Sequence, residues 1–307
     1  MRSTGLFSLG WAFALSAPIS IASAWVIGLF LPFLASAAYA DVRPEPVLSF
    51  VDGADRKVEI GLEQMRTACV EREVEVDDPY HAKRMRYLAL PLACVLDLGF
   101  PDSGGGEGQR GRGLLLRALD GYTRPVSGAE LLEAGGFLAF GESALVDTTS
   151  GTSRFSPIDR RRVDPAPFYL IWTGPGQNDP HVRAWPYQLA RIEVAPFEEA
   201  FPRTVPRGLP KANAGWGGYA LFQKSCASCH AINGEGGRVG PDLNVPLSIV
   251  EYRPISQIRA YVRNPEATRY TSMPAHPQLT EDDLDALIAY FSAMRDRKDD
   301  PRSRGGS

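Results

Sequence analysis

One pentapeptide restricts this chain of 307 residues more than any other feature: Cys226-Ala227-Ser228-Cys229-His230. In a C-x-x-C-H segment the two thiols can add across the vinyl groups of one porphyrin, and the adjacent histidine then lies under the iron as an axial ligand. A zinc site would need a second ligand pair, and neither a second C-x-x-C nor an H-x-x-x-H follows. A redox C-x-x-C would follow a strand in a βαβ unit, which this segment lacks. The pentapeptide therefore predicts one covalently attached haem c.

The first forty residues indicate export from the cytoplasm. Arg2 precedes an almost uncharged apolar stretch from Leu6 to Ala38, and Ala38-Tyr39-Ala40 places small residues where a signal peptidase cuts. Cleavage after Ala40 is the prediction. The apolar stretch is also long enough for an uncleaved membrane anchor of about 20 residues, and this alternative stays open. Because both interpretations place the remainder beyond the membrane, we expect a periplasmic protein.

The length of the chain suits two domains of ordinary size once the leader is removed. The hydrophobic fraction of 44% and the charged fraction of 22% are typical of a soluble globular protein. The net charge is −3 and the basic residues are scattered, so nothing attracts a phosphate backbone. Nucleic acid is excluded as an expected partner.

The pattern from residue 41 to about residue 194 predicts an α+β domain, with short β-rich runs, turn signals and a few helical stretches. The runs 70–76 and 85–88 flank a turn at Asp77-Asp78-Pro79-Tyr80 and predict a hairpin. In the first run Val70, Val74 and Val76 share one face. Residues 90–98 have a helical pattern.

Three segments lack apolar periodicity. Residues 103–113 are rich in glycine and predict a mobile surface loop. Residues 196–215 hold Pro202, Pro206 and Pro210 and predict a linker between domains. Residues 298–307 predict a disordered polar tail.

The last helix of the chain has a clear start signal. Thr280 followed by Asp283 is typical of a helix N-cap. Apolar residues recur at helical spacing on one face of this helix, and they are Leu284, Leu287, Ile288 and Phe291. Upstream, Asn264-Pro265 ends a helix that begins near Ser256, because residues before proline avoid the α region.

The segment from Trp216 to Met294 resembles the class I cytochromes c. The stretch 218–222 resembles the first helix of that family, and Gly240-Pro241-Asp242-Leu243 resembles its G-P-x-L segment. The resemblance implies an all-α domain in which Cys226 and Cys229 hold the haem and His230 is the proximal iron ligand. It also implies that the carbonyl of Pro241 accepts the other N–H of the proximal imidazole, which fixes the ring and raises its basicity.

The sixth iron ligand is expected to come from a loop. Met273-Pro274 lies 43 residues beyond His230 and resembles the M-P ligand loop of the family. The polar neighbours Thr271 and Ser272 indicate a loop rather than a packed helix, so Met273 is the expected distal ligand. His276 is the competitor, since bis-His coordination would lower the reduction potential.

Residues 41–195 resemble the molybdopterin-binding oxidoreductase domain of the sulfite oxidase type. The matching pieces are the run 87–92 with Val95-Leu96, the stretch 118–122 with its A-x-D-G-Y pattern, and the apolar run 167–175. These pieces suggest a fold and leave the activity open. In that family a cysteine thiolate binds molybdenum, and Cys69 lies roughly where the ligand would be sought. A disulfide between Cys69 and Cys94, which an oxidising compartment permits, is the favoured alternative.

The sequence therefore predicts a multidomain protein with a sulfite-oxidase-like α+β N-terminal domain followed by an all-α cytochrome c domain. The expected boundaries are a leader at 1–40, the molybdopterin-oxidoreductase-like domain at 41–195 without its cofactor, the linker at 196–215, the cytochrome domain at 216–297 and the tail at 298–307. We expect single-electron transfer between a redox donor and a redox acceptor, such as a membrane respiratory or periplasmic dehydrogenase complex, with the N-terminal domain as a docking module and no catalytic residue. The rival is a molybdenum-dependent, sulfite dehydrogenase-like enzyme with a fused cytochrome as electron acceptor.

Overall fold

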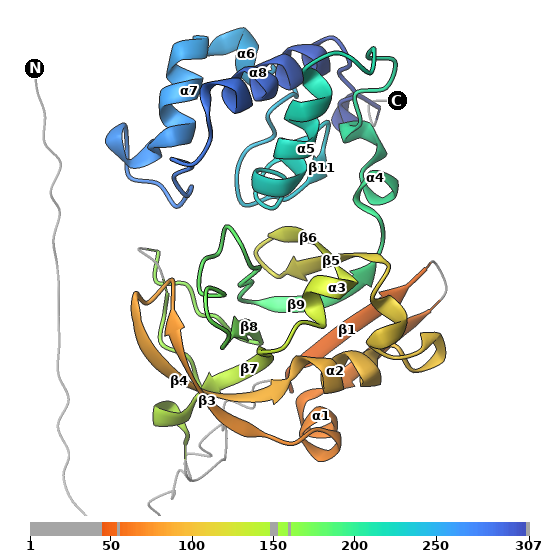
Figure 1. Ribbon diagram of the computed structural model, residues 1–307, viewed down its shortest axis with the longest axis vertical. Helices are drawn as coiled ribbons and strands as arrows, with labels where there is room; N and C mark the ends of the chain where they lie inside the picture. The colour runs from red at the N-terminus through yellow and green to blue at the C-terminus, as the bar shows by residue number, and fades with distance from the viewer. Residues whose placement is uncertain (1–44, 54–55, 148–152, 159–160, 305–307) are drawn as a thin grey trace, which may run out of the picture. The chain divides into compact units, whose positions relative to one another are not determined.

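The computed structural model describes residues 45–53, 56–147, 153–158 and 161–304 (Figure 1). Buried apolar side chains of these residues gather in two clusters. The first cluster runs from Leu48 to Val194 and the second from Tyr219 to Met294. The first belongs to a β-rich N-terminal domain and the second to a helical C-terminal domain. The predicted leader at 1–40 lies outside the described residues. None of the described helices combines the length and apolar character that crossing a bilayer requires.

One sheet of the N-terminal domain has the strand order β2-β1-β9-β5-β6. The bounds are β1 Val47–Asp52, β2 Lys57–Gly61, β5 Gly113–Ala118, β6 Thr123–Ser127 and β9 Leu189–Val194. Strands β1 and β9 pair in parallel, and the other pairs are antiparallel. Leu116 and its cross-strand partner Ile192 are fully buried, so this face of the sheet forms part of the core.

The other sheet of this domain is antiparallel in the order β3-β4-β7-β8. Its strands are β3 Arg72–Asp78, β4 Lys83–Pro91, β7 Gly136–Glu142 and β8 Tyr169–Trp172. The predicted hairpin is confirmed, with Val74 opposite Tyr87 and Val76 opposite Met85. The apolar strand expected within 167–175 is β8. The placement of Val70 on the buried face is wrong: Val70 precedes β3 and is 71% exposed, because the strand starts only at Arg72.

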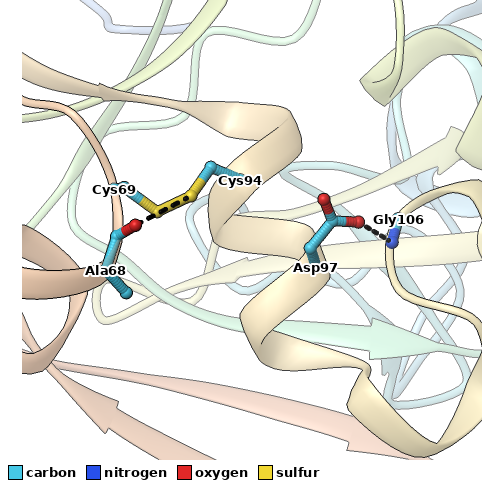
Figure 2. The surroundings of a disulfide bond; sticks show 5 residues. All are labelled: Ala68, Cys69, Cys94, Asp97 and Gly106. Carbon is cyan, nitrogen blue, oxygen red and sulfur yellow. Dashed lines mark hydrogen bonds between the residues drawn. A yellow bond between two sulfur atoms is a disulfide. The ribbon is translucent and has the colours of Figure 1, made fainter.

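Short helices flank these sheets. They are α1 Leu62–Ala68, α2 Leu92–Gly99 and α3 Gly128–Leu131, and α2 confirms the helical pattern expected at 90–98 except that Leu90 and Pro91 still belong to β4. Cys69, just after α1, is joined by a disulfide to Cys94 on α2. Figure 2 shows this bond beside Asp97, which lies on the same helix and accepts the N–H of Gly106 at 2.8 Å.

The glycine-rich segment 103–113 is more structured than its composition indicates. The 3-10 turn Pro101–Ser103 leads into it, and it contains the 3-10 turn Glu107–Gln109. The buried amide of Gln109 donates to the carbonyl oxygen of Gly105 at 3.1 Å and to Ser103. The segment is thus a loop of short turns, and one glutamine side chain supplies hydrogen bonds that organise it.

The predicted linker at 196–215 is packed against the C-terminal domain. It contains the helix α4 Phe197–Ala200 and a 3-10 turn at Pro202–Thr204. Phe201 and Thr204 are buried, and the hydroxyl of Tyr290 donates to the carbonyl oxygen of Thr204 at 2.7 Å. The segment predicted as a linker therefore has a packed part, in which two phenylalanines spaced by one helical turn bury apolar surface.

The C-terminal domain is built from α5 Gly215–Ser225, α6 Ile249–Tyr252, α7 Ile255–Arg263 and α8 Glu281–Arg295, with a short β10–β11 ladder at Ala231–Ile232 and Glu235–Gly236. Helices α5 and α8 lie side by side (Figure 1). Gly218 makes their close approach feasible, since a Cβ at that position would lie 1.9 Å from the carbonyl oxygen of Ala286.

The helix boundaries predicted in this domain are confirmed. Thr280 and Asp283 form a reciprocal capping box at the start of α8. Helix α7 ends at Arg263, and Asn264 has left the helical region before Pro265. The start of the predicted tail is ordered instead: the amide of Asp299 donates to Asn233 at 3.1 Å, and Pro301–Arg304 forms a 3-10 turn. Pro301 opens this turn, and the side-chain oxygen of Asn233 is the acceptor for the Asp299 amide.

Candidate haem-binding site

The C-x-x-C-H segment forms a tight turn at the end of α5. The amide of Cys226 donates to Phe222 in the last turn of the helix, at 2.9 Å. The amides of Cys229 and His230 both donate back to the carbonyl oxygen of Cys226, at 3.1 and 2.9 Å. A single turn of backbone therefore carries both thiols and the imidazole.

The four cysteines of the chain, all within the described residues, divide into two kinds. Cys69 and Cys94 are bonded to each other, whereas Cys226 and Cys229 are free thiols in a partly buried position. Burial raises the pKa of Cys226 to about 12 and that of Cys229 to about 11, so both sulfurs carry their protons at neutral pH.

His230 is held by one ring nitrogen. Its Nδ1 lies 2.8 Å from the carbonyl oxygen of Pro241, and the oxygen can only accept, so Nδ1 carries the hydrogen. Nε2 is then the nitrogen with a free lone pair. Burial lowers the pKa of His230, which keeps the ring neutral and able to bind a metal.

The backbone that reaches Pro241 passes directly against the imidazole. A Cβ on Gly240 would lie 2.5 Å from Cε1 of the His230 ring, and the Gly240 amide donates to Cys229 at 2.7 Å. Gly237 is equally confined, since its Cβ would lie 2.1 Å from the carbonyl oxygen of Ser228. Glycine is therefore required at both of these positions.

A buried polar network, which the sequence analysis missed, fixes this loop. The carboxylate of Asp242 accepts the amides of Gly234 and Asn244 at 2.6 and 2.7 Å. The Asn244 amide group donates to Asn233 and to the carbonyl oxygen of Met294 on α8, both at 2.8 Å. The only signal in the sequence was a concentration of Asn, Asp and Gly, which also occurs in ordinary turns.

The expected distal ligands both lie between α7 and α8. Met273 is in an irregular segment, half-buried, and its amide donates to the hydroxyl of Thr271 at 3.1 Å. His276 is almost fully buried, and its ring centroid lies 5.2 Å from that of His181. Burial, and to a smaller extent the nearby His181 and His230, lowers the pKa of His276 to about 4.

The residues present suit a covalent haem. Two unpaired thiols, one neutral imidazole with Nε2 free and a glycine-lined approach lie in one loop. Around them is an apolar cluster that includes Phe222 of α5, Ile232 of β10 and Leu279 from the irregular segment ahead of α8. Such a donor set supplies both thioether links and an axial ligand, as the C-x-x-C-H chemistry requires.

Residues 217–295 form a cytochrome c domain: the family model for cytochrome c matches this range. The domain implies covalent haem c and electron transfer. The chain is also similar to cytochrome c oxidase subunit 2 of Alkalihalophilus pseudofirmus, with 30% identity over 89 residues, which make up 27% of this chain and 26% of that protein. The chain thus spans about a quarter of the length of the curated relative that it matches. The family of the N-terminal domain stays unidentified.

Proposed function

We propose that this protein is a periplasmic monohaem c-type cytochrome that passes single electrons between two redox partners. The observation that carries the proposal is the free thiol pair of Cys226 and Cys229 beside an imidazole whose Nδ1 is bound to the Pro241 carbonyl. When bound, the haem supplies an iron that gains or loses one electron. The chain attaches it at two sulfurs, holds the proximal ring at Nδ1 and surrounds it with apolar side chains.

Met273 is proposed as the distal ligand. It lies in an irregular segment ahead of α8, and this segment has no helical hydrogen bonds to break when the sulfur turns toward a metal. A closed sixth position leaves outer-sphere electron transfer as the reaction, with transient docking of each partner through a small interface. The similarity to a subunit of cytochrome c oxidase supports a partner from a respiratory chain.

The N-terminal domain is proposed to be a docking module. The sulfite-oxidase-type fold suggested by its sequence remains part of this proposal. The rival molybdenum enzyme needs the Cys69 thiolate as metal ligand, and the disulfide to Cys94 occupies that sulfur. We therefore propose the electron carrier and not the molybdenum enzyme.

Two measurements on the full chain, matured in a host that installs covalent haem, test the function. We expect a haem-linked peroxidase stain on the denatured protein and one iron without stoichiometric molybdenum. Absence of the stain from the wild-type protein would refute its assignment as a c-type cytochrome. One molybdenum per chain would refute the docking role of the N-terminal domain.

A matched pair of variants tests the distal ligand. Met273→Ala should abolish the weak long-wavelength Met-to-iron charge-transfer band of the ferric protein, whereas His276→Ala should retain it. A wild-type protein without this band, whose haem spectrum changes in His276→Ala and not in Met273→Ala, would assign the distal position to His276.

A further inference from the structure

The A-x-D-G-Y stretch of the N-terminal domain has no role in the function proposed so far, yet it contacts the haem-binding loop. Residues 118–122 end β5 and form the turn into β6. We name residues 120–124 the clamp turn. The amide of Thr123 donates to the carbonyl oxygen of Ser228 at 2.9 Å, and the carbonyl oxygen of Gly121 accepts the amide of Arg238 at 3.0 Å. The clamp turn therefore contacts the haem attachment loop at Ser228, between the two cysteines, and at Arg238, shortly after β11.

A third hydrogen bond extends this contact to the end of α5. Nη1 of Arg124 donates to the carbonyl oxygen of Lys224 at 2.8 Å, two residues before Cys226. In all three hydrogen bonds the partner in the cytochrome domain is a backbone group. The bonds therefore fix the position of the loop itself rather than that of one side chain.

The turn has the shape that this contact needs. Gly121 has φ +93°, and a Cβ there would lie 2.9 Å from Cβ of Arg238. The carboxylate of Asp120 accepts the amide of Tyr122 at 2.9 Å, which closes the turn locally. Gly121 is the middle residue of this Asx turn. Both the hairpin and the close approach to the loop require a glycine at this position.

The hydrogen bond between Thr123 and Ser228 is shielded from solvent. Thr123 is 4% exposed and Ser228 is 5% exposed. Ser228 precedes Cys229, so the clamp turn covers the attachment loop next to one attachment point of the haem.

We propose that the N-terminal domain is part of the redox centre: the clamp turn positions the haem attachment loop, excludes water beside Ser228 and thereby raises the reduction potential. This inference rests on the proposed function. Ferric haem carries one more positive charge than ferrous haem, so removing water nearby disfavours the ferric state. Gly121 and Thr123 act through the loop, and they are positioning residues.

Amide exchange in the wild-type holo-protein, in its diamagnetic ferrous form, tests the contact directly. We expect the amides of Thr123 and Arg238 to be protected. In Gly121→Val both should lose protection, and the midpoint potential should fall. Gly53→Val is the matched control, because Gly53 also has positive φ, +77°, but among the described residues beyond its chain neighbours no atom lies within 4 Å of its Cβ position. The control should keep protection and potential unchanged.

A surface variant keeps the proposal testable if Gly121→Val does not fold. Arg124→Gln removes the hydrogen bond to the carbonyl oxygen of Lys224 and should lower the midpoint potential, while Arg86→Gln, an exposed arginine paired with Glu75 on β3, should leave it unchanged. Fast exchange of Thr123 and Arg238 in the wild-type protein, or a potential in Arg124→Gln equal to that of the wild type, would overturn the proposal. The peroxidase stain of every variant reports separately on haem attachment, so loss of the clamp role is distinguishable from failure of the proposed function.

Discussion

Replacement of Gly218 by alanine tests whether the crossing of α5 and α8 is as close as the structure indicates. The new Cβ would lie 1.9 Å from the carbonyl oxygen of Ala286 and 2.7 Å from Cβ of Tyr290, and both are rigid parts of α8. Real Cβ atoms essentially never approach a heavy atom below 3.0 Å, so the helices must separate by about 1 Å or more.

The magnitude follows from two opposed effects. Overpacking of this kind costs up to about 3 kcal/mol. The higher helix propensity of alanine returns about 1 kcal/mol. The net expectation is a loss of about 2 kcal/mol in the free energy of unfolding of the holo-protein.

The neighbouring glycine provides a control of opposite sign. A Cβ on Gly217 would meet its nearest neighbour, Cβ of Ala286, at an ordinary 3.8 Å. Gly217→Ala should therefore stabilise the protein by up to about 1 kcal/mol. Urea unfolding followed by haem absorbance and far-ultraviolet circular dichroism measures both variants. A Gly218→Ala protein as stable as the wild type, or equal effects in the two variants, would refute the close crossing.

Three further predictions concern stability. Replacing Cys69 and Cys94 together by serine removes a cross-link between residues 25 apart, and by loop entropy it should cost about 3.5 kcal/mol in urea unfolding while leaving the haem stain intact; loss of the stain would contradict this separation. The hydrogen bond from Arg112 holds the pKa of buried Asp52 below its ordinary value, so this carboxylate stabilises the fold at pH values above about 4 and the contribution is lost as the pH falls through the depressed pKa. Asp52→Asn should thus cost about 1–2 kcal/mol at pH 7 and progressively less in acid, and a difference from the wild type that does not change with pH would argue against the pair. Thr280→Ala removes the side-chain cap of α8 and should cost about 1 kcal/mol in thermal unfolding, whereas a neutral result would show that the cap is dispensable.

The parts of the structure that the sequence could predict are governed by local rules. The C-x-x-C-H spacing determined the haem chemistry, because three reactive groups within five residues have few other uses. The capping box at Thr280 and the helix end at Asn264 followed from hydrogen bonding and proline sterics within a few residues. The hairpin of β3 and β4 followed from alternation around a turn.

Contacts between residues far apart in the chain lay beyond such rules. Val70 continues the alternation of β3 but is exposed, since pairing with β4 begins only at Arg72. The order in the predicted linker depends on a hydroxyl from Tyr290, 86 residues away. No local pattern distinguishes a proline-rich segment that packs from one that does not.

By itself the sequence determined the chemistry of this protein, because covalent haem attachment depends on residue types at fixed short spacing. The tertiary structure alone decided which distant groups surround that chemistry: the Pro241 carbonyl at Nδ1 of His230, the Asn244 network to α8, and the turn at Gly121 against the attachment loop. Each of these contacts has a backbone group on at least one side, and every residue type has the same backbone, so the partners become visible only once the chain is folded.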